Sequence, residues 1–286
     1  MGILKIRSIS IVFLLVMVLS VFASSDSLLV SGDSRSSIAW GVECQMEESE
    51  IQASSNVCAA IEALFDYIDY DFVEDFYGEE TYYQDVYDYA HYCNNNFDFA
   101  IVFYKGHGAY NLGSPVPHFW LYDNEENAIV DSFIGEKTYD GVHDFAFLWA
   151  CGMANWQGVI MLGEPVGMSA SWLYRDDLEE DTHDYPDYSG HCFISFANAS
   201  LWFVDDTGYE DYTFEDFVIG FYEYVTDSYT IDEALDQAAY DCFGVNFQST
   251  WLYTGYWYNC TLPPPMGGLW WSYIREFGDG SMMLTT

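Results

Sequence analysis

The sequence predicts an α/β fold, a three-layer α/β/α sandwich in which helices cover both faces of a mostly parallel β-sheet. Between residues 37 and 106, strand-like and helix-like segments alternate, which is the order of a parallel sheet and its crossover helices. The segments at 97–106 and 144–151 are too apolar to keep one face in water, as expected of strands buried on both sides. The 286 residues carry no evident internal repeat and suffice for one domain with a sizeable core.

The segment up to residue 106 predicts three strands and two helices in alternation. "SIAWGVEC" at 37–44 is typical of a short strand. Residues 47–68 place apolar side chains at helical spacing and acidic ones at the start, where a helix N-terminus favours them. We expect a second strand at 71–78 and a second helix at 79–96, which ends in an asparagine cluster. "FDFAIVFYKG" at 97–106 is then the third strand.

The middle of the chain predicts a hairpin and further strands. Residues 118–133 alternate apolar and polar side chains around an Asp-Asn-Glu-Glu-Asn turn, which is typical of a hairpin. Apolar strands are expected at 144–151 and 158–165. Residues 167–199 are expected to form a strand, a long acidic loop and another strand.

Two helices and a connector complete the predicted domain. Residues 213–227 and 230–244 each begin with a threonine, and acidic residues follow it two and three positions later. This pattern is typical of helix N-termini. "LPPPMGG" at 262–268 is expected to be a stiff connector. We therefore expect one domain over residues 37–286, preceded by a polar segment at 24–36.

The first 23 residues are typical of an export signal. Lys5 and Arg7 precede an apolar run, Ile9 to Phe22, and Ala23 offers a small residue for cleavage. The run has about 14 residues, fewer than the roughly 20 that span a bilayer as a helix. We therefore expect a secreted or cell-surface protein without a membrane span in its mature chain. An uncleaved anchor is the alternative.

The charge of the chain excludes some partners. The formal net charge is −39, with 46 acidic residues against 7 basic ones, and such a surface repels nucleic acid and anionic lipid. It either attracts basic peptides or cations, or serves as a solvated coat suited to salt or acid. The 20% aromatic content argues against disorder.

Two residues with catalytic chemistry follow apolar strands. His107 stands in a Gly-His-Gly after the strand at 97–106, and Cys151 ends the segment "FAFLWAC". Reactive groups gather at the carboxyl ends of neighbouring parallel strands, and a thiol beside an imidazole is the minimal nucleophile and base for acyl transfer. Each residue alone is more typical of a turn histidine or a buried thiol. Their joint placement favours a Cys-His dyad.

These segments, in this order, resemble the caspase, legumain, gingipain and clostripain group of cysteine peptidases. The resemblance rests on a strand ending in His-Gly, "FAIVFYKGHG", a hairpin, "HFWLYDNEENAIVD", and a strand ending in Ala-Cys, "FAFLWAC". With the preceding strands and helices it covers about residues 37–200, and it implies a caspase-like sandwich. Trp149 departs from the caspase pattern, which has glutamine before Ala-Cys, and no activation segment is evident.

The resemblance also implies a mechanism. Cys151 would attack the scissile carbonyl as a thiolate, while His107 would protonate the leaving amine and later activate water. The backbone N–H groups of Gly108 and Cys151 would stabilise the oxyanion. The glycines beside His107 fit a place where backbone approaches a substrate closely.

Substrate-binding residues are expected after the nucleophile. "SASWLYR" followed by "GHCFISF" resembles the segment that shapes the primary specificity pocket in caspases, with Ser171 and Trp172 on a pocket strand. Core packing is the alternative for Trp172. Relatives of the group each require one residue before the cut, variously Asp, Asn, Arg or Lys.

The charge pattern favours cleavage after a basic residue. Lys105 and Arg175 are the cations nearest the expected site, so recognition of Asp is not excluded. Acidic residues crowd the same stretch, however, and Asp176 or Asp177 could pair with a substrate guanidinium. An acidic surface also repels an acidic peptide.

The seven cysteines separate into two expected kinds. In an oxidising compartment cysteines tend to pair, and an odd count leaves one over. We expect Cys151 to stay a free thiol and the other six to form disulfides, without a preferred connectivity. These six are Cys44, Cys58, Cys93, Cys192, Cys242 and Cys260.

Other kinds of site lack their sequence patterns. The chain has no His-Glu-x-x-His zinc motif, no Cys-x-x-Cys pair, no Gly-x-Ser-x-Gly elbow and no phosphate-binding loop. The acidic loop at 176–187 lacks the ligand spacing of a calcium-binding hand. We therefore expect no metal and no cofactor.

Three functions are compatible with these patterns. The first is an exported cysteine endopeptidase that acts on peptide or protein substrates. The second is a catalytically inactive surface or binding protein that keeps the caspase-like scaffold. The third is a transpeptidase, because an amine can resolve an acyl-enzyme in place of water. The oligomeric state stays open.

Overall fold

The computed structural model describes residues 34–77, 81–113, 117–138, 143–155, 159–161, 164–173, 190–260 and 268–285. Residues Asp33–Thr286 form one compact unit. Three predicted features lie outside the described residues: the export signal, Asp176 and Asp177, and the connector at 262–268 apart from its last residue. No helix among the described residues is long and apolar enough to cross a membrane.

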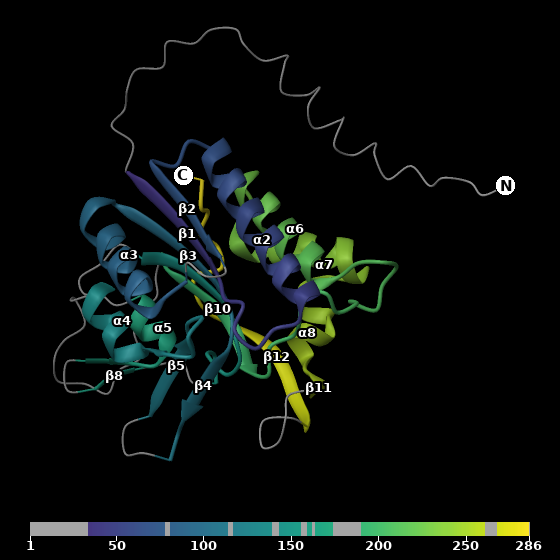
Figure 1. The fold of residues 1–286 in the computed structure, drawn as a ribbon. Coiled ribbons are helices and arrows are strands. Elements are labelled where there is room, and N and C mark those ends of the chain that lie inside the picture. Colours follow the sequence, from purple (N-terminus) through teal and green to yellow (C-terminus); the bar gives the residue numbers. More distant parts are fainter. Residues whose placement is uncertain are drawn as a thin grey trace, which may run out of the picture. The chain divides into compact units, whose positions relative to one another are not determined.

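A seven-stranded, mostly parallel sheet forms the centre of the domain (Figure 1). Its strand order is β11-β12-β10-β7-β3-β1-β2. The five strands from β10 to β2 run parallel, whereas β12 and β11 add an antiparallel edge. The strands are β1 (Arg35–Gly41), β2 (Phe72–Tyr77), β3 (Phe99–Lys105), β7 (His143–Trp149), β10 (Cys192–Asn198), β11 (Tyr256–Cys260) and β12 (Gly268–Gly278).

Helices cover both faces of this sheet, so the predicted three-layer sandwich is confirmed (Figure 1). One apolar core lies under α2 (Glu48–Tyr67), α6 (Phe214–Thr226) and α7 (Ile231–Phe243). The other lies under α3 (Tyr83–Asn96), α4 (Asp131–Thr138) and α5 (Met168–Trp172). The inner strands β3 and β7 are buried along nearly their whole length, which explains their continuously apolar sequences.

The helices α6 and α7 begin where the threonine pattern predicts. Thr213 and Asp216 form a capping box at the start of α6, and Thr230 and Glu233 form one at the start of α7. Each box satisfies backbone N–H groups that would otherwise lack a partner in the first turn.

Two smaller sheets complete the architecture, and here the predictions need correction. The predicted hairpin is confirmed as β5 (His118–Tyr122) and β6 (Ala128–Val130), but β4 (Gly108–Asn111) extends it to three strands. The strand predicted at 158–165 consists of two short antiparallel strands, β8 (Val159–Met161) and β9 (Glu164–Val166). The structure adds a 3₁₀ turn (Phe247–Ser249) and α8 (Trp251–Thr254) before the antiparallel edge.

The predicted disulfides are absent among the cysteines whose side chains the structure describes. Those six cysteines are free thiols, Cys151 included, so the expectation that the other five take part in disulfides is wrong. The central sheet separates Cys93, in the core under α3, α4 and α5, from Cys58, Cys192 and Cys242, which belong to the core under α2, α6 and α7. The side chain of Cys260 lies outside the described part.

Candidate active site

The register of β3 against β7 brings the two expected catalytic residues to one place. These neighbouring strands run parallel, and Lys105 pairs with Trp149 at the end of the ladder. His107 and Cys151 each follow two residues later. They therefore leave the sheet at the same level, at the carboxyl edge where ligands bind in open α/β sheets.

The backbones after the two strands are in close contact. A Cβ atom placed on Gly108 would lie 2.6 Å from the carbonyl oxygen of Cys151 and 2.9 Å from the terminal methyl of Met153. No side chain fits at such a distance, so Gly108 is glycine because the chain around Cys151 occupies that space. This is a different reason from the substrate approach that the sequence suggested.

The imidazole of His107 is largely buried and has one nitrogen free. Among the described residues, Nε2 has no hydrogen-bond partner. Burial lowers the pKa of His107, and the positive charge of Lys105 lowers it further, while hydrogen bonds to the backbone at Cys44 and Gln45 act in the opposite direction. The ring is therefore mostly neutral at pH 7, the state in which it can accept a proton.

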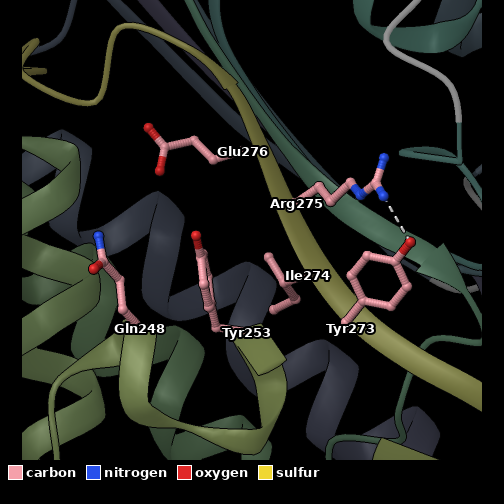
Figure 2. A pocket seen from close by; sticks show the side chains of 6 residues that line it. All are labelled: Gln248, Tyr253, Tyr273, Ile274, Arg275 and Glu276. Atoms are coloured by element: carbon pink, nitrogen blue, oxygen red, sulfur yellow. Dashed lines mark hydrogen bonds between the residues drawn. The ribbon is translucent and has the colours of Figure 1, made fainter. Parts of the chain in front are cut away.

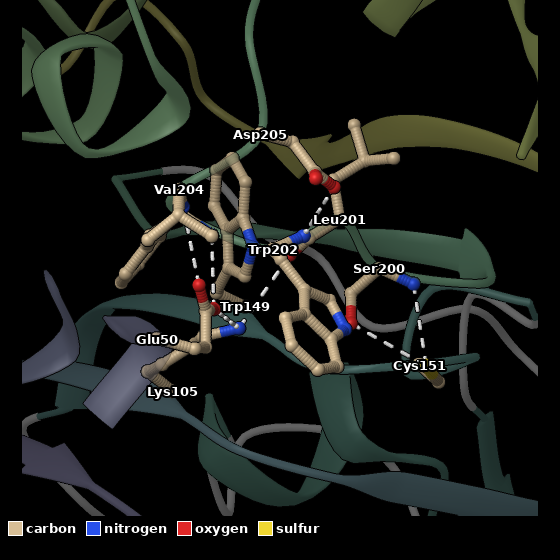
Figure 3. A network of polar contacts seen from close by, with 10 residues as sticks. Glu50, Lys105, Trp149, Cys151, Ser200, Leu201, Trp202, Val204 and Asp205 are labelled. Atoms are coloured by element: carbon tan, nitrogen blue, oxygen red, sulfur yellow. Dashed lines mark hydrogen bonds and ion pairs between the residues drawn. The ribbon is translucent and has the colours of Figure 1, made fainter. Parts of the chain in front are cut away.

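The thiol of Cys151 is half-buried and contacts Ser200 twice (Figure 3). The backbone N–H of Ser200 donates to Sγ at 3.2 Å, and the Ser200 hydroxyl lies 3.3 Å from the same sulfur. The two contacts fix the position of the sulfur, and the N–H donor is able to bind it in its neutral or its charged state.

Both reactive side chains line one small cavity. Its volume is about 20 Å³, room for a single water and too little for most substrate side chains. The lining residues are Met46, Glu50, Lys105, Gly106, His107, Cys151, Ser200 and Trp202.

A buried ion pair lies in the wall of this cavity (Figure 3). Lys105 Nζ is 2.7 Å from Glu50 Oε1, and at most 3% of either side chain is exposed. The Glu50 carboxylate also accepts the backbone N–H groups of Phe203 at 2.8 Å and Val204 at 3.1 Å. Lys105 is therefore committed to a partner inside the protein.

Sequence reasoning missed Glu50 and Ser200. A signal existed for the first, since a lysine at the end of an apolar strand needs a carboxylate if it is buried. No comparable signal marks Ser200, which is 49 positions from Cys151 and meets it through the tertiary fold.

The expected specificity residues are not brought to the cavity. Ser171 and Trp172 lie on helix α5 instead of a strand, and neither side chain has measurable exposure. Trp172 packs against Trp40 and His143, with ring centroids 6.1 and 5.7 Å apart. The prediction of a strand at this place is wrong, and both side chains are buried, with Trp172 in the apolar core that was its alternative.

A larger hollow of about 400 Å³ lies along β12 (Figure 2). It holds none of the residues that the sequence predicts for catalysis. Its lining residues are Gln248, Tyr253, Tyr273, Ile274, Arg275 and Glu276. Among the described residues, no cluster of three or more histidine, cysteine or acidic side chains is arranged to hold a metal ion.

Comparison with known proteins gives similarity in structure alone. No family model and no curated protein sequence matches the chain. The Arg-specific cysteine proteinase gingipain R matches with a TM-score of 0.46 and 14% identity over 87% of this chain. The Drosophila initiator caspase Dronc matches with a TM-score of 0.43 and 7% identity over 86% of this chain and 80% of its own. The chain spans about half, 47%, of the gingipain R chain. Similarity at this level carries no argument about activity, which depends on the site's own residues.

Proposed function

We propose that the protein is a cysteine peptidase in which Cys151 is the nucleophile and His107 the general acid and base. The observation that supports this most is the register of β3 and β7, which leads a neutral imidazole and a half-buried thiol into one cavity. The ring nitrogen Nε2 of His107, which has no partner among the described residues, is able to take the proton of the thiol.

In the first half of the proposed reaction, the Cys151 proton passes to His107 and the sulfur forms a bond to the scissile carbonyl carbon. The carbonyl oxygen then carries a negative charge, which the backbone N–H groups of Gly108 and Cys151 stabilise. When the C–N bond breaks, His107 gives its proton to the leaving amine. The result is a thioester between Cys151 and the acyl part of the substrate.

In the second half, water replaces the sulfur. His107 takes a proton from the water as its oxygen bonds to the thioester carbon, and the C–S bond breaks. The released acid carries the new oxygen, and the proton on His107 returns to the Cys151 thiolate. A transpeptidase would differ only in that an amine attacks instead of water.

The ion pair at Lys105 supports a preference for basic rather than acidic substrates. Because Glu50 already neutralises Lys105 at 2.7 Å, this lysine does not offer a free positive charge to a substrate carboxylate. The overall charge of −39 acts in the same direction. We propose cleavage after Arg or Lys, with Asp176 or Asp177 as the pocket carboxylate, and export of the chain through residues 1–23.

Replacement of the nucleophile tests the proposal. Cys151→Ala is expected to lower the rate of peptide cleavage by at least about a thousandfold, since it removes the covalent step, and His107→Ala should have nearly the same effect. Cleavage is measured by mass spectrometry on a peptide library, which also reports the residue before the cut.

Cys93→Ala is the matched control, because it removes a buried thiol on α3, away from the cavity. Turnover by Cys151→Ala at the wild-type rate would refute the peptidase proposal. A native protein that cleaves no peptide in the library would favour the inactive scaffold instead.

A further inference from the structure

The segment that contacts the nucleophile is a loop that follows β10. Residues 199–206, named here loop 199–206, connect β10 to the region before α6. Ser200 in this loop is the residue whose N–H and hydroxyl meet the sulfur of Cys151. The position of the loop therefore decides whether these two groups reach the thiol.

Buried groups from several elements hold loop 199–206 in place. The indole of Trp149, at the end of β7, donates to the carbonyl of Leu201 at 2.6 Å. The hydroxyl of Ser272, on β12, donates to the carbonyl of Ala199 at 2.5 Å. Trp149 stands where the caspase pattern has glutamine, and in this chain the residue at that position binds the loop.

The Glu50–Lys105 pair contacts the loop at several points. Glu50 binds the backbone N–H groups of Phe203 and Val204, while the Lys105 ammonium lies 3.5 Å from the carbonyl of Leu201 and 4.8 Å from the Phe203 ring centroid. A buried ion pair is poor evidence of stability, because desolvation offsets most of its attraction. Here the pair instead connects three parts of the chain: Glu50 on α2, Lys105 on β3 and loop 199–206.

We propose that Glu50 and Lys105 are positioning residues that fix loop 199–206 so that Ser200 stabilises the thiolate of Cys151. This inference rests on the proposed function in taking Cys151 as the nucleophile. The titratable and charged groups that line the cavity with the thiol are His107, Lys105 and Glu50.

The pH profile of Cys151 alkylation tests the inference without any need for turnover. The rate of iodoacetamide modification at Cys151, followed by mass mapping, rises with pH as the thiolate forms. In Ser200→Ala, Glu50→Gln and Lys105→Met, the midpoint is expected to move up by about one pH unit, which is about tenfold less thiolate at a lower fixed pH.

The direction of the shift separates positioning from simple electrostatics. Loss of the negative charge in Glu50→Gln would by itself favour the thiolate and lower the midpoint, whereas loss of the positive charge in Lys105→Met would raise it. Positioning predicts that both variants raise it. The double variant should then resemble either single one, because both disable the same attachment.

Asp131→Asn is the matched control. Asp131 is also a buried carboxylate that accepts backbone N–H groups, those of Gly167 and Ser132, but it holds α5 rather than loop 199–206. Its alkylation profile should coincide with that of the wild type.

Opposite shifts in Glu50→Gln and Lys105→Met, or profiles that coincide with the wild type in all three variants, would overturn the inference. If Glu50→Gln and Lys105→Met do not fold, Glu50→Asp decides, because it keeps the charge but withdraws the carboxylate from the N–H groups of Phe203 and Val204. A protein that cleaves no peptide but shows the upward shifts would refute the peptidase proposal and leave the positioning role standing.

Discussion

At the scale of single residues, the site depends on how closely two backbone segments approach. The chain after β3 passes so near the chain after β7 that Gly108 has no room for a Cβ atom beside the Cys151 carbonyl. The N–H groups proposed for the oxyanion, those of Gly108 and Cys151, belong to these two segments. A methyl group added at this position therefore forces apart the segments that carry His107 and Cys151.

Gly108→Ala is expected to lower peptide cleavage by at least about a hundredfold, the typical effect of losing one oxyanion donor. The added methyl would meet the Cys151 carbonyl oxygen at 2.6 Å, so the two backbones must separate. Initial rates of cleavage measure the effect.

Gly220→Ala is the matched control for this glycine. Gly220 lies in α6, and its Cβ would meet only the methyl of Ala238 on α7, at 4.0 Å. Alanine is also the better helix former by about 1 kcal/mol. Full activity in Gly220→Ala together with full activity in Gly108→Ala would show that the close contact is unimportant.

At the scale of elements, helix α5 shows where a short apolar segment misleads. Five residues without strong periodicity are compatible with a strand or a buried helix, and the helix forms because α5 packs on α4 and the sheet. The side chains of Ser171 and Trp172 are then enclosed by the core. A substitution tests whether Trp172 contributes to stability or to substrate specificity.

Trp172→Ala is expected to cost about 3–5 kcal/mol of unfolding free energy, the usual range for a buried aromatic residue. The residue preference before the cleaved bond should stay the same, because the ring packs against Trp40 and His143 and does not line the cavity. Urea unfolding and peptide-library profiling measure the two effects.

Trp172→Phe keeps most of the packing and serves where the alanine variant is too unstable to profile. A changed residue preference in Trp172→Phe would return Trp172 to the specificity pocket.

At the scale of the whole molecule, the sequence predicts the strands and helices whose apolar side chains form the two cores. The strands β1, β2, β3, β7 and β10 and the helices α2, α3, α6 and α7 were predictable, because their apolar patterns report burial directly. The prediction of His107 and Cys151 at neighbouring strand ends needed only strand boundaries and the order of the sheet. The edge strands β11 and β12 were not predicted, and Ser200 depends on a loop whose path only tertiary contacts fix.

The half-buried carboxyl group of Glu276 makes the stability of the molecule depend on pH. Glu276, on β12, borders the hollow shown in Figure 2. Burial raises its pKa to about 7, and the neighbouring negative charge of Asp232 raises it as well. The backbone of Asp232 binds the carbonyl of Gly280 at 2.9 Å, so the two carboxyl groups lie where α7 meets the C-terminal segment.

This pair should make the protein more stable in mild acid than at neutral pH. Between its ordinary pKa of 4.5 and about 7, Glu276 holds a proton in the folded state that it loses in the unfolded chain. The unfolding free energy therefore falls as pH rises through this window, by up to about 1.4 kcal/mol per pH unit for one proton.

Glu276→Gln, which has no proton to lose, should flatten this slope and be more stable than the wild type at pH 8. Urea unfolding at pH 5 to 8 measures it, with the exposed Glu48→Gln as a control for net charge. Equal slopes in the wild type and Glu276→Gln would show that Glu276 is already ionised in the folded protein at pH 5.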